Sequence, residues 1–278
     1  MDEYQERLVR VGLGVLAEYG FALAGGYALQ AHQLVDRLSE DVDLFTDSWD
    51  TEDFSRAVDA VVVAFKREVL EVSVPQREAT FCRLEVTDPL IGKVATVDMA
   101  ADFRQYEPVS LSVGPVIAES DAVASKVAAV FSRGYARDYL DLAGILESGR
   151  FSGEQLMQMA EQVDAGFSKA WFAEALAAVD RFQDQDFTRY GVDVARVGRV
   201  REIMRDWSEK LRLEVQPTEL EPGAHRTATP DLGHEVGRKP PGDPSTLEMR
   251  RSQLGGRLLR PTETSTPDEP EPRRGIEL

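Results

Sequence analysis

The sequence predicts an α+β protein of two lobes, in which a mixed β-sheet flanked by helices is followed by a helical bundle and a tail. Three observations predict this architecture. Strand-length apolar runs dominate up to residue 116, helical periodicity dominates from there to residue 214, and 10 of the 14 prolines lie beyond residue 214. We therefore expect lobes at 1–116 and 117–214. We expect residues 215–278 to be disordered, because so polar a segment buries too little apolar surface to offset the entropy of ordering.

The elements of the first lobe follow from apolar spacing and from glycine and proline positions. Helical spacing of apolar residues predicts a first helix, which Gly20 ends. A buried strand follows, then the Gly25-Gly26 turn and a second helix. The expected helices are 2–19, 26–34 and 50–68, and the expected strands are 21–25, 42–45, 69–74, 80–86, 93–100 and 110–118.

The second lobe reads as helices throughout. Ser152 and Ser168 are expected N-caps, because each precedes a helical pattern and serine oxygens accept hydrogen bonds from first-turn amides. The expected helices are 119–132, 136–147, 153–164, 168–180 and 193–214.

Composition narrows the class of protein. The single cysteine, Cys82, excludes an intrachain disulfide and fits a reducing cytoplasm. No apolar run approaches the roughly 20 residues that span a bilayer, so we expect no membrane segment. The formal charge of −17 argues against a broad nucleic-acid-binding surface. Residues 1–214 hold 23 basic and 38 acidic residues, and so carry −15 of that charge.

Two carboxylates, Asp41 and Asp43, lie one residue apart in an apolar strand. Side chains at i and i+2 of a strand face the same way, so both acids share one face. Two charged carboxylates buried on one face of a strand without partners would cost much free energy. At the end of a strand, however, such a pair can bind a divalent cation. A solvated loop is the alternative interpretation of this pair.

Gly25 and Gly26 precede that pair and lie between a strand and a helix. Backbone amides at such a junction can receive phosphate oxygens, and glycine permits the close approach. A tight turn alone would also explain them. Together with the carboxylate pair about 15 residues later, the glycines favour a phosphate and metal site.

A third acid and a second cluster complete the candidate site. Asp98 lies in an apolar strand, where it could bind a metal or accept the proton of the attacking hydroxyl group. We prefer Asp98 to the nearby Asp102 as the third acid of the site. The stretch 125–146 places Lys126 before an Arg137-Asp138 pair, which suggests a triphosphate ligand and a positioning element. Ordinary helix salt bridges are the alternative.

At these residues the chain resembles the AbiEii/AbiGii toxin family, a branch of the DNA-polymerase-β-like nucleotidyltransferase superfamily that includes the MenT-type toxins. The family's first motif is approximately G-G-x-A-L, a histidine, then R-x-S-x-D-x-D-L-F. It matches Gly25, Gly26, Ala28, Leu29, His32, Arg37, Ser39, Asp41, Asp43, Leu44 and Phe45. Its second motif matches Lys126, Ala129, Arg133, Arg137, Asp138, Asp141 and Leu142. The resemblance covers about residues 5–150.

The resemblance implies a nucleotidyltransferase fold, with 1–116 as its catalytic lobe, and an Mg²⁺-dependent toxin that transfers a nucleotide from an NTP. Some members modify the 3′ end of tRNA, so an RNA acceptor and a neutralising antitoxin are implied. We expect two Mg²⁺ ions. The expected metal ligands are Asp41, Asp43 and Asp98, and the expected catalytic residues are these three with Lys126 and Asp138. The expected nucleotide-binding residues are Gly25, Gly26, Ser39, Lys126, Arg133, Arg137 and Asp141.

Alternatives remain for the acceptor and for activity. The acidic charge would suit a cationic small-molecule acceptor, as in antibiotic-modifying nucleotidyltransferases. A non-catalytic nucleotide-binding regulator is a further alternative, which intact Asp41, Asp43 and Lys126 argue against. The most basic surface is the helix 193–214, and a solvated face balanced by its own acids is an interpretation at least as strong as a binding surface.

Overall fold

The computed structural model describes residues 1–164 and 166–214, and it confirms the mixed α/β architecture. Its centre is a seven-stranded sheet of order β3-β4-β5-β2-β1-β7-β6. The strands are β1 (Ala22–Leu23), β2 (Asp41–Thr46), β3 (Glu71–Arg77), β4 (Phe81–Asp88), β5 (Lys93–Ala101), β6 (Val109–Leu111) and β7 (Gly114–Val116). The tail 215–278 lies outside the described residues.

Pairing in the middle of the sheet places the expected acids next to one another. Strand β2 runs parallel to β5 and antiparallel to β1, so the sheet is mixed as predicted. The register sets Asp43 opposite Asp98 on β5. On its other side β5 pairs antiparallel with β4, where Arg83 stands opposite Asp98. Three strands therefore bring these side chains into one row.

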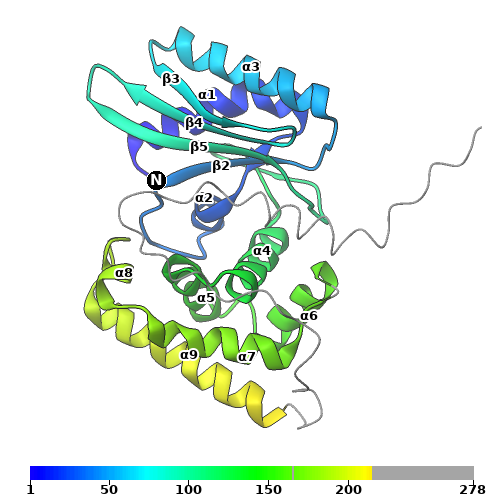
Figure 1. Cartoon of the computed structure of the whole chain (residues 1–278), viewed down its shortest axis with the longest axis vertical. Coiled ribbons are helices and arrows are strands. Elements are labelled where there is room, and N and C mark those ends of the chain that lie inside the picture. Colours follow the sequence, from blue (N-terminus) through cyan, green and yellow to red (C-terminus); the bar gives the residue numbers. More distant parts are fainter. Residues whose placement is uncertain (165, 215–278) are drawn as a thin grey trace, which may run out of the picture.

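Two helices cover one face of the sheet, α1 (Glu3–Leu16) and α3 (Thr51–Arg67) (Figure 1). Helix α1 begins with a capping box between Asp2 and Gln5, and a 3₁₀ turn (Ala17–Tyr19) and Gly20 end it. Helix α3 begins at Asp50, whose carboxylate accepts the amides of Glu52 and Asp53 at 2.9 Å each. Both helices bury their apolar stripes against the strands.

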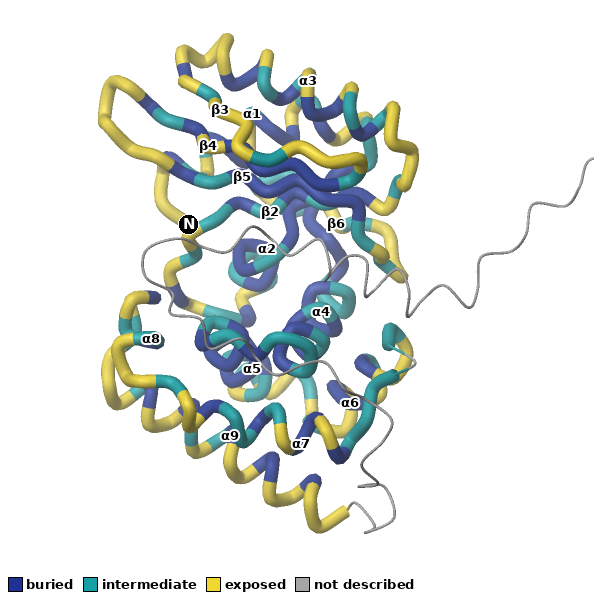
Figure 2. Tube along the Cα trace, in the orientation of Figure 1, coloured by how far each residue is buried: buried dark blue, intermediate teal, exposed yellow. Residues whose placement is uncertain are grey.

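The remaining helices pack on the other side of the sheet, with α2 (Gly25–Ala31) between the strands and the bundle (Figure 1). They are α4 (Glu119–Ser132), α5 (Ala136–Glu147), α6 (Gly153–Val163), α7 (Lys169–Ala177), α8 (Asp184–Thr188) and α9 (Val194–Glu214). Figure 2 shows that α5 is largely buried, whereas α9 has an exposed outer face. Ser152 and Ser168 cap α6 and α7, as predicted.

The two largest differences from the expectation are a hairpin and an additional helix. The run 110–118 is a hairpin of β6 and β7, because Gly114 (φ +116°) reverses the chain in a conformation that favours glycine. Helix α8 was not predicted, since its five residues carry too few apolar positions to show a period. None of the helices in the described part of the chain is long and apolar enough to cross a bilayer.

Candidate active site

The glycine turn is held by the side chains it faces. Gly25 has φ +60°, and a Cβ added there would overlap the Asp43 carboxylate. A Cβ on Gly26 would come within 2.8 Å of the Ser39 hydroxyl oxygen. The Ala24 amide also donates to the Asp43 carbonyl at 2.8 Å. Gly25 is therefore required by the close approach of the carboxylate strand, and Gly26 by the close approach of the loop before that strand.

Asp41 and Asp43 share one face of β2, as the strand period predicts. The intervening Val42 and the following Leu44 are completely buried, whereas both acids are half-buried and line a cavity between the sheet and the helices. Two carboxylates on one face of a strand offer the oxygen ligands that a hard divalent cation such as Mg²⁺ prefers. These residues fit a metal ion by their chemistry and by their access to the cavity.

Asp98 lines the same cavity but is held by an arginine. The Arg83 guanidinium donates to both Asp98 oxygens, at 2.7 and 2.8 Å, and both side chains are almost fully buried. Such a bidentate pair is among the strongest that a carboxylate forms. No group of three acidic, histidine or cysteine side chains in the described residues is arranged to hold a metal. Asp98 as a third ligand therefore stays a prediction.

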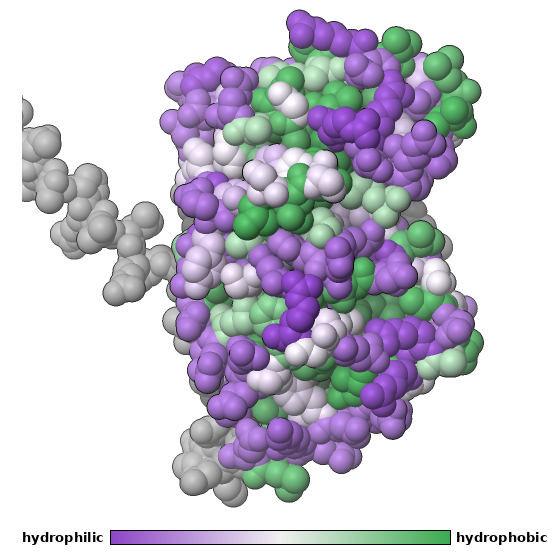
Figure 3. Space-filling model, turned by 180° about the vertical axis from the view of Figure 1, so that it is seen from behind, coloured by the Kyte–Doolittle hydropathy of each residue, from purple (hydrophilic) through white to green (hydrophobic). Residues whose placement is uncertain are grey.

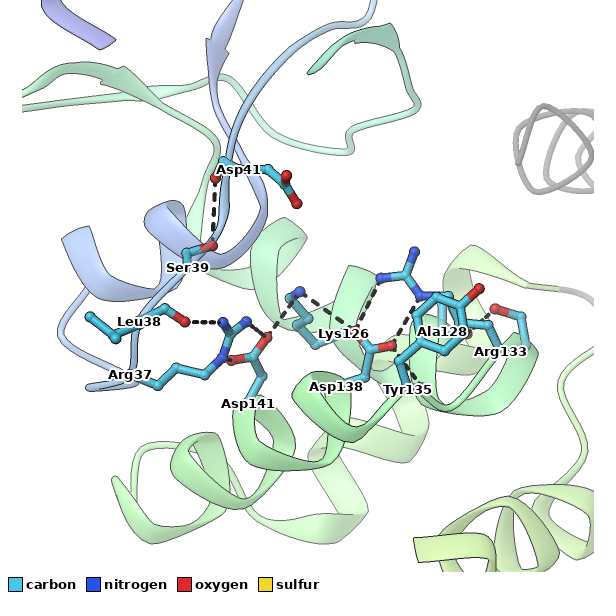
Figure 4. Close-up of polar contacts among 11 residues, drawn as sticks. Arg37, Leu38, Ser39, Asp41, Lys126, Ala128, Arg133, Tyr135, Asp138 and Asp141 are labelled. Carbon is cyan, nitrogen blue, oxygen red and sulfur yellow. Dashed lines mark hydrogen bonds and ion pairs between the residues drawn. The ribbon is translucent and has the colours of Figure 1, made fainter. Parts of the chain in front are cut away.

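A buried ion cluster joins α4 and α5 on the opposite wall of the cavity (Figure 4). Asp141 accepts from Arg37 at 2.6 and 2.8 Å and from Lys126 at 3.0 Å. Asp138 accepts from Arg133 at 3.0 Å through both oxygens and lies 3.8 Å from Lys126. Burial alone would raise the pKa of Asp141, but Lys126 and Arg37 outweigh it and hold that pKa below its ordinary value.

The cluster leaves a positive wall that faces the acids. Its three cations, Lys126, Arg133 and Arg37, exceed its two carboxylates, and all three line the cavity. Arg137 lines it as well. Burial opposes the charge of Arg137, yet Asp138 and a hydrogen bond with the Tyr190 side chain raise its pKa above the ordinary value. A cavity with acids on one wall and cations on the other can bind a metal together with a phosphate group.

Most of the sequence-predicted site residues line this one cavity. Those that do are Gly25, Gly26, Ser39, Asp41, Asp43, Asp98, Lys126, Arg133 and Arg137. Asp138 and Asp141 do not line it, because both are completely buried behind Lys126, Arg133 and Arg37. We expected Asp138 among the catalytic residues and Asp141 among the nucleotide ligands. Their positions instead favour holding the cations in place.

Several residues near the site were not among the predicted site residues, including Arg37, Arg83 and Tyr190. Arg37, which matches the family motif, lines the cavity and pairs with Asp141. Arg83 could have been suspected, because an arginine in the apolar run "TFCRLEV" needs an acidic partner on a neighbouring strand. Tyr190 also lines the cavity, from the turn after α8, and no pattern in the sequence marked it.

Two solved structures that are described as nucleotidyltransferases are similar to this chain. One from Helicobacter pylori, described as a putative nucleotidyltransferase, has 14% identity and a TM-score of 0.50, covering 78% of this chain and 100% of its own. MenT4, a nucleotidyltransferase toxin from Mycobacterium tuberculosis, has 20% identity and a TM-score of 0.49, covering 78% of this chain and 86% of its own. No curated protein matches the chain. The likeness to the H. pylori structure shows a shared fold.

The family follows from the sequence model that matches residues 15–223, described as the nucleotidyl transferase AbiEii toxin of type IV toxin–antitoxin systems. This range is about three quarters of the chain and reaches well past residue 150, where the motif resemblance ended. The chain therefore belongs to the AbiEii family of nucleotidyltransferase toxins. Membership implies an NTP substrate and an antitoxin partner.

Proposed function

We propose that this protein is an Mg²⁺-dependent toxin that transfers a nucleoside monophosphate from an NTP to an RNA 3′ end, that of tRNA being the acceptor implied by the family resemblance. One observation carries the proposal. Asp41 and Asp43 face a cavity whose opposite wall is formed by cationic side chains, among them Lys126 and Arg137. This is the charge pattern that a metal-bound triphosphate requires.

The roles divide between the two walls. Asp41 and Asp43, with Asp98 as a further candidate, would hold the metal, which when bound would neutralise charge on the phosphate oxygens. Lys126, Arg133 and Arg137 would bind the triphosphate, and Gly25 and Gly26 would let it approach the backbone. The acceptor hydroxyl then attacks the α-phosphorus, its proton passes to a base, and the bond to pyrophosphate breaks.

We assign Asp138 and Asp141 to positioning. Each carboxylate pairs with two cations at distances up to 3.8 Å and has no exposed surface. Lys126 ends a flexible four-carbon chain with an ammonium that would otherwise sample several orientations, so these acids fix where the ammonium points. Ser39, close to Gly26, would help to fix the turn.

The acceptor has a second candidate, favoured by one observation. Residues 1–214 carry a net charge of −15, which attracts a cationic small molecule more readily than a polyanion. An aminated small molecule would then replace RNA as the acceptor at the same site. The nucleotide chemistry of the two candidates is identical, so the experiment must vary the acceptor.

The test uses purified full-length protein with Mg²⁺, each labelled NTP in turn, and either total tRNA or a panel of aminated small molecules. We expect label on tRNA, and a loss of at least about 100-fold in Asp41→Asn, because that change removes a charged metal ligand. Asp59→Asn is the matched control, since Asp59 lies on α3 in a surface ion pair with Arg77. Label only on a small molecule would select the second acceptor, and transfer that survives in Asp41→Asn would refute the site.

A further inference from the structure

Tyr190 belongs to the helical part of the molecule, yet it lines the cavity beside residues of the loop before β2. It follows α8 in a turn, and only 1% of its surface is exposed. The hydroxyl group of a buried tyrosine usually has a hydrogen-bond partner. Tyr190 has further contacts through its backbone and its ring, and each leads to a residue of the nucleotide site.

The turn 188–191 contacts the loop that leads to Asp41. The Leu38 amide donates to the Tyr190 carbonyl at 3.1 Å. The Leu38 side chain lies against Gly191, where an added Cβ would come within 3.1 Å of it. Arg189 forms an ion pair with Glu40 at 3.0 Å, directly before the strand of the metal-binding acids. The turn therefore fixes the loop 38–40 from outside.

The ring of Tyr190 supports the cation cluster. The Arg37 guanidinium lies over this ring, 5.5 Å from its centroid. Arg37 in turn donates to both oxygens of Asp141, which also accepts from Lys126 at 3.0 Å. A guanidinium over an aromatic face is attracted by the ring and keeps its in-plane donors for carboxylates. Tyr190 therefore contacts Lys126 indirectly, through Arg37 and Asp141.

The hydroxyl group of Tyr190 acts on Arg137. Lys126 and Arg133 each contact a carboxylate of the cluster, whereas the Arg137 guanidinium lies 5.0 Å over the Tyr135 ring and hydrogen-bonds with the Tyr190 side chain. A neutral phenol orients a guanidinium without cancelling its charge. Arg137 therefore keeps a positive charge toward the cavity while its orientation is restricted.

We propose that Tyr190 is a positioning residue of the nucleotide site, which aims Arg137 at the triphosphate and joins the helical bundle to the loop before Asp41. This inference rests on the proposed function, because it takes the anion in the cavity to be the triphosphate of an NTP. The 188–191 turn is then a part of the active site contributed by residues remote in sequence. Loss of the contacts made by this turn would increase the mobility of both walls of the cavity.

The experiment measures NTP binding without an acceptor, by isothermal titration of the full chain with NTP and Mg²⁺, and then the KM and kcat of transfer. Tyr190→Phe removes the hydroxyl group and keeps the ring. We expect the Kd and the KM for the NTP to rise about tenfold, as for loss of an interaction that orients a charged hydrogen-bond donor. We expect kcat to change little.

Two further variants separate positioning from stability. Tyr139→Phe is the matched control, since Tyr139 is equally buried and its hydroxyl donates to the Ala175 carbonyl at 2.7 Å, outside the cavity lining. It should lower the Tm and leave the Kd unchanged. In an Arg137→Gln background, Tyr190→Phe should weaken binding no further. An unchanged Kd in Tyr190→Phe, or an equal loss in both backgrounds, would overturn the inference.

These outcomes stay distinct from a failure of the proposed function. The positioning role of Tyr190 is read from the Kd for the NTP, whereas the transfer reaction is read from the Asp41→Asn variant. Normal transfer with an unchanged Kd in Tyr190→Phe overturns only the inference. A wild-type protein that binds no NTP overturns both.

Discussion

At the scale of single residues, Gly25 shows how closely the two halves of the first motif are packed. An added methyl group would overlap the Asp43 carboxylate, and φ is +60°. We predict that Gly25→Ala lowers transfer about 100-fold, because displacing a metal-binding carboxylate by about 1 Å has an effect of that order. Transfer assays at saturating NTP, with circular dichroism to establish folding, measure this.

The control for that prediction is another glycine of similar conformation. Gly92 has φ +68°, but nothing lies within 4 Å of an added Cβ. Gly92→Ala should therefore cost only about 1 kcal/mol for the left-handed backbone and leave transfer intact. If Gly25→Ala proved no worse than Gly92→Ala, the close approach of Asp43 would have no catalytic consequence.

Sequence alone can indicate the site residues whose relative positions are fixed within one strand or one helix. Asp41 and Asp43 share a face in any strand, so their common orientation follows from spacing alone. The Arg83–Asp98 pair depends instead on the register between β4 and β5, which spacing within one strand does not fix. Tyr190 is brought to the site by the packing of α8 and α9, about 150 residues after Asp41 along the chain.

At the scale of elements, α4 and α5 are joined by buried charges as well as by apolar packing. Burial alone would raise the pKa of Asp138, but Arg133 and Lys126 outweigh it and hold that pKa below its ordinary value. The stability that Asp138 contributes is therefore present above about pH 4, the usual pKa of an unfolded aspartate, and is lost as the pH falls below it. We predict that the free energy of unfolding falls steeply below about pH 4.

The variant Asp138→Asn tests the origin of that slope. It leaves Arg133 and Lys126 without one carboxylate, so we expect it to lower the free energy of unfolding by about 3 kcal/mol at pH 7. We also expect a shallower decline below pH 4, measured by urea unfolding at several pH values. Asp180→Asn, which breaks a surface pair with Arg205, should change neither. An unaltered acid slope in Asp138→Asn would assign the slope to other carboxylates.

Prediction of elements succeeded where a pattern was long. Helices α4 and α5 have the predicted bounds, because each repeats the apolar period over three or more turns. The hairpin of β6 and β7 was read as one strand, because each arm has only three residues and alternation cannot show a reversal that short. Helix α8 is missed for the same reason, because its five residues are too few to show a period.

At the scale of the whole molecule, the acidic charge opposes binding of the proposed RNA acceptor. Helix α9 carries the most basic surface and is where RNA would bind if that surface were free of acidic partners. Its arginines are instead paired with acids of α9 itself and of neighbouring elements. Arg199 contacts Glu202, Arg205 contacts Asp180 and Arg212 contacts Glu174, at 2.6, 2.7 and 2.9 Å. Figure 3 shows hydrophilic and apolar residues mixed over the face opposite to that of Figure 1. The solvated-face interpretation of α9 therefore fits better than an RNA-binding surface.

We therefore predict that RNA binds through few phosphate contacts, chiefly at the cavity. The triple variant Arg199→Ala, Arg205→Ala, Arg212→Ala should leave the KM for the acceptor within about twofold of the wild-type value, because its charges are matched within the fold. The plot of log KM against log salt concentration should have a slope of about 1 to 3, as for one to three phosphate contacts. Transfer assays with labelled NTP between 50 and 200 mM salt, conditions in which many contacts would change affinity by about 10³-fold or more, measure both quantities. A steep slope that the triple variant flattens would instead identify α9 as the surface that holds the acceptor.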